Sequence, residues 1–207
     1  MKQEITALRQ AMLAAGVDAY IIPTEDFHGS EYVGDYFKCR SYVSGFTGSA
    51  GTLVVTASDA LLWTDGRYFL QAADQLAGTG IALMKMREPG VPTIEAWLEA
   101  HLRPGQTLGF DGRTMTAYAG ARYAKAAEKQ GAGVRFDRDL VGEIWTDRPA
   151  RSEKPVWAPD DAFTGKTRRE KLADLKAAVK DAGADAHVLA DLSDIAWLLN
   201  LRGDDVQ

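Results

Sequence analysis

Cysteine is almost absent from this 207-residue chain. Its single cysteine, Cys39, has no second cysteine with which to form an internal disulfide. Long apolar runs are absent too, and no stretch approaches the roughly 20 apolar residues that a membrane-spanning helix needs. The first six residues, Met-Lys-Gln-Glu-Ile-Thr, carry an early acid and no apolar core of a signal peptide. We therefore expect a cytoplasmic protein with no membrane partner.

Positive charge is also in short supply. The chain has 24 Lys and Arg against 29 Asp and Glu, which gives a formal net charge of -5. Binding to nucleic acid needs clustered Lys and Arg, so we expect no nucleic-acid partner. Hydrophobic residues at 46% and charged residues at 26% are typical of an ordinary soluble globular protein, long enough for one substantial core and a remainder.

The first 150 residues predict an α/β domain with a mixed sheet flanked by helices. Short apolar and β-branched runs predict strands at residues 19–22, 52–56, 60–64, 81–86 and 107–110. Helical spacing predicts helices at residues 5–15, 68–76, 93–102 and 118–130. Only Ala57-Ser58-Asp59 separates the second and third strands, which predicts a hairpin and therefore an antiparallel pair inside the sheet.

The pattern lapses in a proline-containing stretch after residue 147, and we interpret residues 151–163 as a linker between domains. Beyond it come a predicted helix at 167–181 and an apolar run at 186–190. Within them, six positions of residues 175–186 repeat residues 8–19 at one constant offset, including the turn Ala-Gly-x-Asp-Ala. The repeat predicts that residues 164–207 begin a second, similar α/β domain. This second copy has too few strands for a sheet, so we expect the sequence to be part of a longer protein.

The densest cluster of small residues is Ser44-Gly45-Phe46-Thr47-Gly48-Ser49-Ala50-Gly51, just before a predicted strand. A hydrolase that uses Ser49 as nucleophile would need glycine two residues before it, and Thr47 stands there. A phosphate-binding loop would need a following lysine and a helix. We therefore favour a tight turn that lets backbone pass closely.

Arg67 is the strongest candidate for a binding residue. It lies in Trp63-Thr64-Asp65-Gly66-Arg67, where a predicted strand ends and a helix begins. A guanidinium there offers a planar fork to a carboxylate or a peptide carbonyl, although an internal salt bridge is an alternative. Asp65 is more simply a helix cap.

Three other places could carry chemistry. The segment 25–32 gathers three acids and His28, but no second stretch supplies metal ligands at a recognisable spacing, so we expect no metal site. Cys39, between Lys38 and Arg40, would have a lowered pKa if exposed, whereas an unreactive thiol is the simpler interpretation. The basic stretch 166–171 is explained by a solvated helix face.

An ordered set of segments resembles the cytosolic three-domain Xaa-Pro aminopeptidases of the creatinase/prolidase superfamily. The set comprises Tyr20-Ile21-Ile22-Pro23, His28, Ser30-Glu31-Tyr32, residues 43–52, 63–72, 83–86 and 144–149, Ile195-Ala196-Trp197-Leu198 and Asn200-Leu201-Arg202-Gly203. The resemblance covers nearly the whole chain.

The resemblance implies two N-terminal domains of ribonuclease H-like fold and a C-terminal pita-bread catalytic domain outside these residues. In the family, that domain holds two divalent metals, usually manganese, through two Asp, one His and two Glu. The resemblance therefore implies no catalytic residue, metal ligand or cofactor in this chain, which alone should be inactive. The implied partners are short peptides with proline at the second position, the protein's own catalytic domain and further subunits in a homo-oligomer.

The resemblance also bears on roles within this chain. The N-terminal region would shape substrate access and subunit association, with Arg67 reaching the bound peptide. For His28 it gives a position facing the cleft but no role. An alternative function from another class stays open, namely a creatinase-like module that binds proteins or peptides without peptidase activity.

Overall fold

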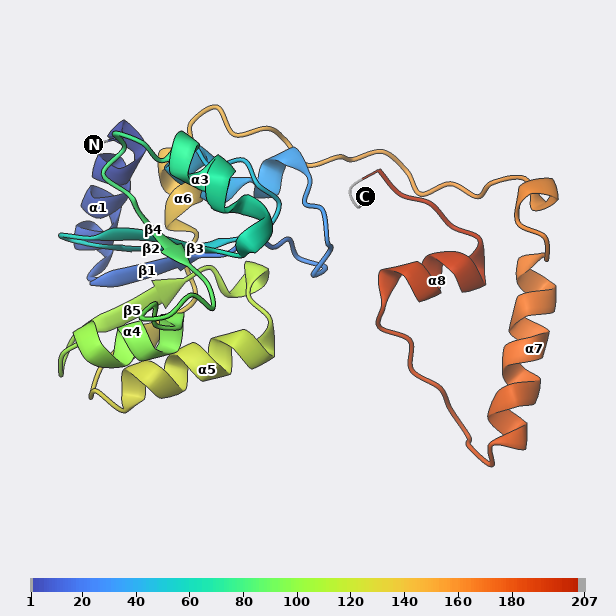
Figure 1. Cartoon of the computed structure of the whole chain (residues 1–207). Coiled ribbons are helices and arrows are strands. Elements are labelled where there is room, and N and C mark those ends of the chain that lie inside the picture. The colour runs from blue at the N-terminus through green and yellow to red at the C-terminus, as the bar shows by residue number, and fades with distance from the viewer. Residues whose placement is uncertain (1, 205–207) are drawn as a thin grey trace. The chain divides into compact units, whose positions relative to one another are not determined.

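The computed structural model describes residues 2–204 and divides into two compact units, Met1–Ala150 and Arg151–Gln207. In Figure 1 the first unit runs from blue to yellow and the second from orange to red. Within residues 2–204, no helix is long and apolar enough to cross a membrane.

A six-stranded mixed sheet forms the centre of the first unit, in the order β4-β3-β2-β1-β5-β6. The strands are β1 (Ala19–Ile22), β2 (Thr52–Thr56), β3 (Ala60–Thr64), β4 (Ala82–Lys85), β5 (Thr107–Phe110) and β6 (Gly133–Arg135). β2 pairs antiparallel with β1 and β3, whereas the remaining pairs are parallel. The predicted hairpin and mixed sheet are confirmed, while β6 was not predicted.

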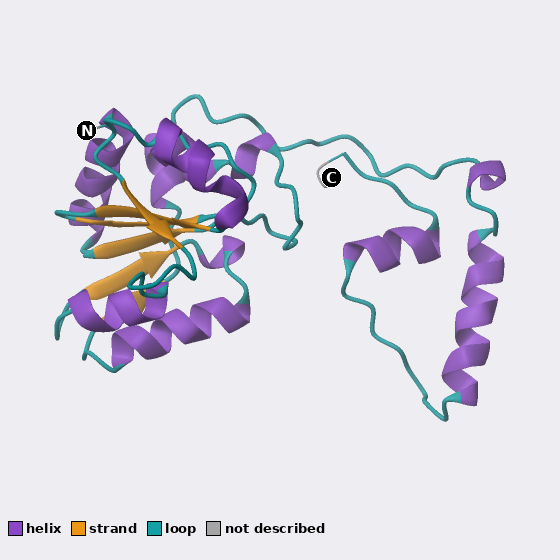
Figure 2. Cartoon of the chain, viewed as in Figure 1, coloured by secondary structure: helices purple, strands orange, loops and turns teal. Residues whose placement is uncertain are grey.

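Helices cover both faces of this sheet (Figure 2). They are α1 (Gln3–Ala15), α2 (Cys39–Ser44), α3 (Phe69–Gln75), α4 (Ile94–His101), α5 (Ala117–Glu128) and α6 (Leu140–Ile144). Side chains of β1 alternate between two cores, with Tyr20 and Ile22 packed in the core that includes α1 and α6, and Ala19 and Ile21 in the core that includes α4 and α5. A strand buried on both faces explains the continuous apolar run in the sequence.

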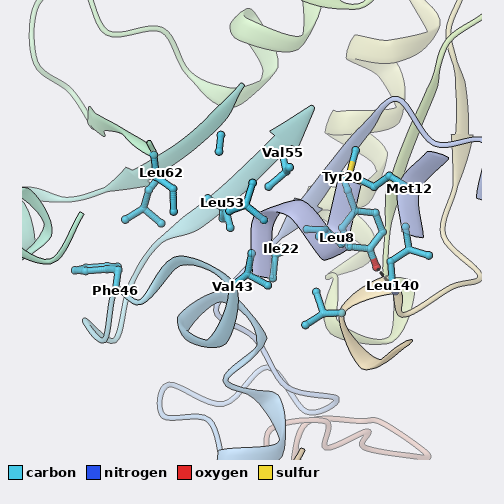
Figure 3. Packing of buried hydrophobic residues seen from close by; sticks show 14 of the residues in the cluster. Leu8, Met12, Tyr20, Ile22, Val43, Phe46, Leu53, Val55, Leu62 and Leu140 are labelled. Carbon is cyan, nitrogen blue, oxygen red and sulfur yellow. Dashed lines mark hydrogen bonds between the residues drawn. The ribbon is translucent and has the colours of Figure 1, made fainter. Parts of the chain in front are cut away.

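The first helix shows how the sequence determines its packing. Ile5, Leu8 and Met12 recur at helical spacing and are almost fully buried against the sheet (Figure 3). Gly16 ends the helix with a φ of 65°, a left-handed conformation that glycine adopts without steric cost. Truncation of one such buried leucine to alanine typically costs about 2–5 kcal/mol.

The second unit contains α7 (Arg168–Asp181) and α8 (Leu192–Leu199). A capping box between Thr167 and Glu170 begins α7, as the predicted helix requires. The prediction of a solvated face for 166–171 is wrong at Lys171, which is buried and donates hydrogen bonds to Asn200 Oδ1 (2.6 Å) and the carbonyl of Trp197 (2.8 Å). A buried ammonium needs such acceptors.

The apolar run at 186–190 is not a strand, contrary to the repeat-based expectation. Its counterpart β1 is a strand because it is hydrogen-bonded to β2 on one side and to β5 on the other. Residues 186–190 have no strand partner within the described chain, and four of the five are exposed. The division into a linker and a second, similar domain stays a prediction.

Candidate functional site

The C-terminal edge of the sheet brings together the loops that carry the candidate residues. β1, β3 and β5 run in the same direction because β1 and β3 are each antiparallel to β2, and β5 is parallel to β1. Their carboxyl ends therefore lie along one edge, where binding sites of α/β sheets are commonly found. Two strands separate β3 from β5, so their ends are roughly 14 Å apart.

At the end of β3, Asp65 caps a short 3-10 turn, η2 (Gly66–Tyr68), by accepting a hydrogen bond from the amide of Arg67 (3.1 Å). The same carboxylate binds the guanidinium of Arg67 in a two-bond fork, with Nε and Nη2 each 2.9 Å from an oxygen. These side-chain bonds lower the pKa of Asp65 and raise that of Arg67. The predicted cap and the alternative internal ion pair are thus both present.

Arg67 remains accessible despite this ion pair. Its side chain is 67% exposed, and its Cζ lies 5.2 Å from the ring centre of Tyr68. Within the part of the chain that is described, Nη1 makes no hydrogen bond, so the guanidinium retains donors for a ligand. The aspartate fixes its orientation without covering it.

A second motif of the same kind, not recognised in the sequence, lies at the end of β5. Asp111 caps the turn η3 (Gly112–Thr114) and accepts bonds from the amide (3.0 Å), Nε (3.0 Å) and Nη2 (2.9 Å) of Arg113. The repeated tripeptide Asp-Gly-Arg after a predicted strand was the available signal. In contrast to Arg67, the Nη2 of Arg113 also lies 3.5 Å from Asp139, and its Cζ lies 5.1 Å from the ring centre of Phe27.

His28 is exposed on the segment that follows β1. The buried Asp26 accepts hydrogen bonds from the amides of His28 (2.8 Å) and Ser30 (3.0 Å), which fix the turn. Burial opposes ionisation of Asp26, yet these donors hold its pKa below the ordinary value. Tyr32 of the same segment is close enough to Arg67 to contribute, after Asp65, to the raised pKa of that residue. Within the described residues, no hydrogen bond or ring contact joins His28 directly to Arg67.

The glycine-rich stretch 44–51 packs closely, as predicted, but it is an irregular loop that follows α2 and not a regular turn. A Cβ on Gly48 would lie 2.3 Å from the ring of Phe46, and a Cβ on Gly51 would lie 3.0 Å from the carbonyl of Trp63. The hydroxyl of Ser49 is hydrogen-bonded to that of Tyr68 (2.6 Å). The loop therefore serves close packing beside η2, where Arg67 is located.

Arg40 holds this loop in place, although no sequence pattern marks it as a candidate residue. It is 4% exposed, and it donates to Thr24 Oγ1 (2.6 Å), to the carbonyl of Phe46 (2.9 Å) and to the carbonyl of Gly48. Burial lowers its pKa to about 10. All three nitrogens are used to join the loop before β2 to the loop after β1.

Cys39 does not have the lowered pKa that its basic neighbours could have produced. Burial raises the pKa of its thiol to about 12, and the nearby Arg148 only partly offsets this effect. Arg40 points its guanidinium at backbone oxygens instead. The interpretation of Cys39 as an unreactive thiol is consistent with this environment.

The described residues build no metal centre, and the cavity at this edge of the sheet is too small for a peptide. Residues 2–204 contain no group of three or more His, Cys, Asp or Glu side chains arranged to hold a metal ion. A cavity between the ends of β1 and β5, lined by Glu25, Asp111 and Asp139, has a volume of about 10 Å³, which suits one water molecule. Binding at this edge would therefore use the exposed surface around Arg67.

Two family models, both described as the creatinase/prolidase N-terminal domain, match residues 4–137 and 147–207. Aminopeptidase P2 of Arabidopsis thaliana is 44% identical over 194 residues, which are 92% of this chain and 27% of that protein. An Xaa-Pro aminopeptidase of Caenorhabditis elegans is 42% identical over 189 residues, covering 91% of this chain and 31% of the relative. The chain thus spans about a third of the length of the curated relatives it matches.

Solved structures show the same similarity. The crystal structure of an X-prolyl aminopeptidase from C. elegans, described as a cytosolic enzyme with a di-nuclear active site, superposes with a TM-score of 0.85 at 38% identity, over 99% of this chain and 35% of that one. The N-terminal domain of the cytoplasmic peptidase PepQ from Mycobacterium tuberculosis superposes with a TM-score of 0.50 at 28% identity, over 70% of this chain and 99% of that one.

Proposed function

Because this chain belongs to the creatinase/prolidase N-terminal domain family, we propose that it is the non-catalytic N-terminal region of a cytoplasmic, metal-dependent Xaa-Pro aminopeptidase. The parent enzyme hydrolyses the bond between an N-terminal residue and a following proline. One observation carries the proposal: the chain superposes over 99% of its length on an X-prolyl aminopeptidase, with a TM-score of 0.85.

In this proposal the chemistry belongs to a catalytic domain outside residues 2–204, where two divalent metal ions, proposed to be manganese, would supply a bridging hydroxide. The di-nuclear site named for the C. elegans enzyme supports two metals. The proposed role of this region is to shape substrate access and to support subunit association in a homo-oligomer.

Arg67 is the residue through which this region contacts the peptide. Its guanidinium is held in one orientation by Asp65, and its Nη1 and exposed face remain available to a peptide carbonyl or carboxylate. A preorganised donor loses little conformational entropy on binding, which favours the bound peptide. His28, exposed on the segment that also carries Tyr32, is a second residue of this peptide-facing edge.

The proposal is tested by assaying release of the first residue from an Xaa-Pro-Xaa tripeptide. The 207-residue chain and its full-length parent are each tested with added Mn²⁺ and with a chelator. Hydrolysis by the metal-loaded parent alone supports an accessory region of a peptidase. Hydrolysis by the 207-residue chain would place the active site within it and overturn the assignment.

The same assay separates the alternative function, a creatinase-like module that binds peptides without cleaving them. A parent that binds the tripeptide in a calorimetric titration but releases no free amino acid at any metal concentration supports the binding module. The similarity to enzymes named as aminopeptidases favours hydrolysis.

A further inference from the structure

Asp139 interacts with two arginines, Arg148 and Arg113. It caps α6 by accepting a hydrogen bond from the amide of Gly142 (2.7 Å) through Oδ1. Its other oxygen, Oδ2, lies 2.5 Å from Nη1 of Arg148 and 3.5 Å from Nη2 of Arg113. Gly142 makes this close approach possible, because a Cβ there would lie 2.6 Å from Oδ2 and 2.7 Å from Arg148 Nη1.

Arg148 uses the rest of its guanidinium to hold the segment before α2. Its side chain is only 10% exposed, and its Nε donates to the carbonyl of Tyr36 (2.8 Å). Its Cζ lies 3.7 Å from the centre of the Tyr36 ring, and Nη2 donates to Cys39 Sγ (3.1 Å). A buried guanidinium with every nitrogen engaged is fixed in place and fixes its partners.

Aromatic contacts continue from Tyr36 to the loop that carries His28. Tyr36 packs edge-to-face on Phe37 at 4.9 Å between ring centres, and Phe37 packs in the same way on Phe27 at 4.8 Å. The ring of Phe27 also receives the guanidinium of Arg113, which returns to Asp139. The contacts therefore form a closed circuit that includes Phe27, the residue directly before His28.

We propose that Asp139 and Arg148, with Arg113, are positioning residues that hold the segment 25–37 in the conformation that peptide binding requires. The proposal rests on the proposed function, because it assigns to these residues the ordering of the peptide-facing edge. None of the three is assigned contact with the peptide. They act through Phe27 and Tyr36 on His28 and Tyr32.

Segment 25–37 needs these stabilising contacts because it has little regular secondary structure of its own. Between β1 and α2 it forms one short 3-10 turn, η1 (Asp35–Phe37), and most of its residues are exposed or half-buried. Ordering a loop costs conformational entropy that its own few hydrogen bonds do not offset. The contacts of Arg148 and Arg113 supply the missing attachment at both ends of the segment.

The first test measures amide exchange by mass spectrometry in the 207-residue chain. Asp139→Asn keeps an oxygen for the cap but removes the charge that two arginines share, and Arg148→Met keeps an apolar stem without the guanidinium. We expect segment 25–37 to exchange about tenfold faster in both variants, with β1 and β5 unchanged. Arg148→Lys, which keeps the charge but not the fork, should restore part of the protection and covers the case in which Arg148→Met fails to fold.

The matched control is Glu143→Gln, which removes an ion pair from the same helix. Glu143 Oε1 binds Arg138 Nη2 at 2.7 Å, but both side chains are 41% exposed, and this ion pair involves no residue of segment 25–37. Exchange in this variant should match the unmodified chain. Unchanged exchange in Asp139→Asn and Arg148→Met as well would overturn the proposal.

The second test separates positioning from mere stability. In the full-length parent, the Asp139→Asn and Arg148→Met variants should raise KM for an Xaa-Pro-Xaa tripeptide about tenfold or less while kcat is retained, and Arg148→Lys should recover part of the loss. Faster exchange with an unchanged KM would show a structural role only and would overturn positioning. Failure of the proposed function is visible separately, since the unmodified parent would then not cleave the tripeptide.

Discussion

Arg67 and Arg113 lie at the ends of two parallel strands, and each forms the same two-bond ion pair with the aspartate two residues before it. The sequence Asp-Gly-Arg after a strand thus produces one local geometry twice. The surroundings of the two arginines differ. Arg113 also contacts Asp139 and the ring of Phe27, whereas Arg67 is two-thirds exposed and its Nη1 is available to a ligand.

The first prediction concerns catalysis by the parent enzyme. Arg67→Ala should lower kcat/KM for Xaa-Pro-Xaa peptides by about tenfold or more, because a charge-assisted hydrogen bond to the peptide is worth roughly 1.5–3 kcal/mol. The free energy of unfolding should stay close to that of the unmodified enzyme, since an exposed ion pair contributes little to stability. Steady-state kinetics and urea denaturation measure the two quantities.

Arg122 offers a matched control for this substitution. It is a half-exposed arginine that pairs with Glu95 (2.6 Å) between α5 and α4, far along the sequence from the candidate edge. Arg122→Ala should leave kcat/KM unchanged. Equal kinetics of the Arg67→Ala variant and the unmodified enzyme would remove Arg67 from the peptide-binding surface.

The second prediction concerns the glycine-rich loop 44–51. Gly48→Ala should destabilise the first unit by about 2 kcal/mol or more, because the new Cβ would lie 2.3 Å from the ring of Phe46 and 2.7 Å from that of Tyr68. Gly34→Ala is the control, since nothing lies within 4 Å of its Cβ and its φ of -63° suits any residue. Urea midpoints that are equal for the two variants would contradict the packing argument.

Local features of this fold could be predicted from the sequence, whereas contacts between distant residues could not. Strands β1 to β5 followed from short apolar and β-branched runs, and the close packing of the loop 44–51 followed from its glycines, because both signals are local. The contacts of Asp139, Arg148 and Tyr36 could not be predicted, since Arg148 and Tyr36 are 112 residues apart in the sequence. Lys171 was misjudged for the same reason, because its acceptor Asn200 lies 29 residues away and only the folded helix pair brings them together.

The third prediction concerns pH and Cys39. Burial raises the pKa of this thiol from 9.0 to about 12, so the folded state keeps the proton over a range in which the unfolded chain loses it. The stabilisation is therefore complete below about pH 9 and is lost as the pH rises towards 12. Between about pH 8 and pH 10.5 the unfolding free energy should fall by about 2 kcal/mol more in the unmodified chain than in Cys39→Ser.

Alkylation checks the same environment independently. Iodoacetamide at about pH 8 should react much more slowly with folded Cys39 than with the chain unfolded in urea, because the half-buried thiol has a raised pKa and keeps its proton at this pH. Rapid modification of the folded chain, read by mass spectrometry, would show that Cys39 is exposed and that the pH argument does not apply.

The last prediction concerns Arg40, the buried arginine that joins the loops before β2 and after β1. Arg40→Met removes three donors and leaves the carbonyls of Phe46 and Gly48 without their partner, so we expect a loss of about 3 kcal/mol or more in unfolding free energy. Arg40→Lys should lose nearly as much, because an ammonium cannot reproduce the planar arrangement that reaches Thr24 and both carbonyls. Lys38→Met, at an exposed neighbouring position, serves as control and should cost less than about 0.5 kcal/mol. If Arg40→Lys retains full stability in urea denaturation, the charge alone suffices and the fork geometry is not what holds the two loops together.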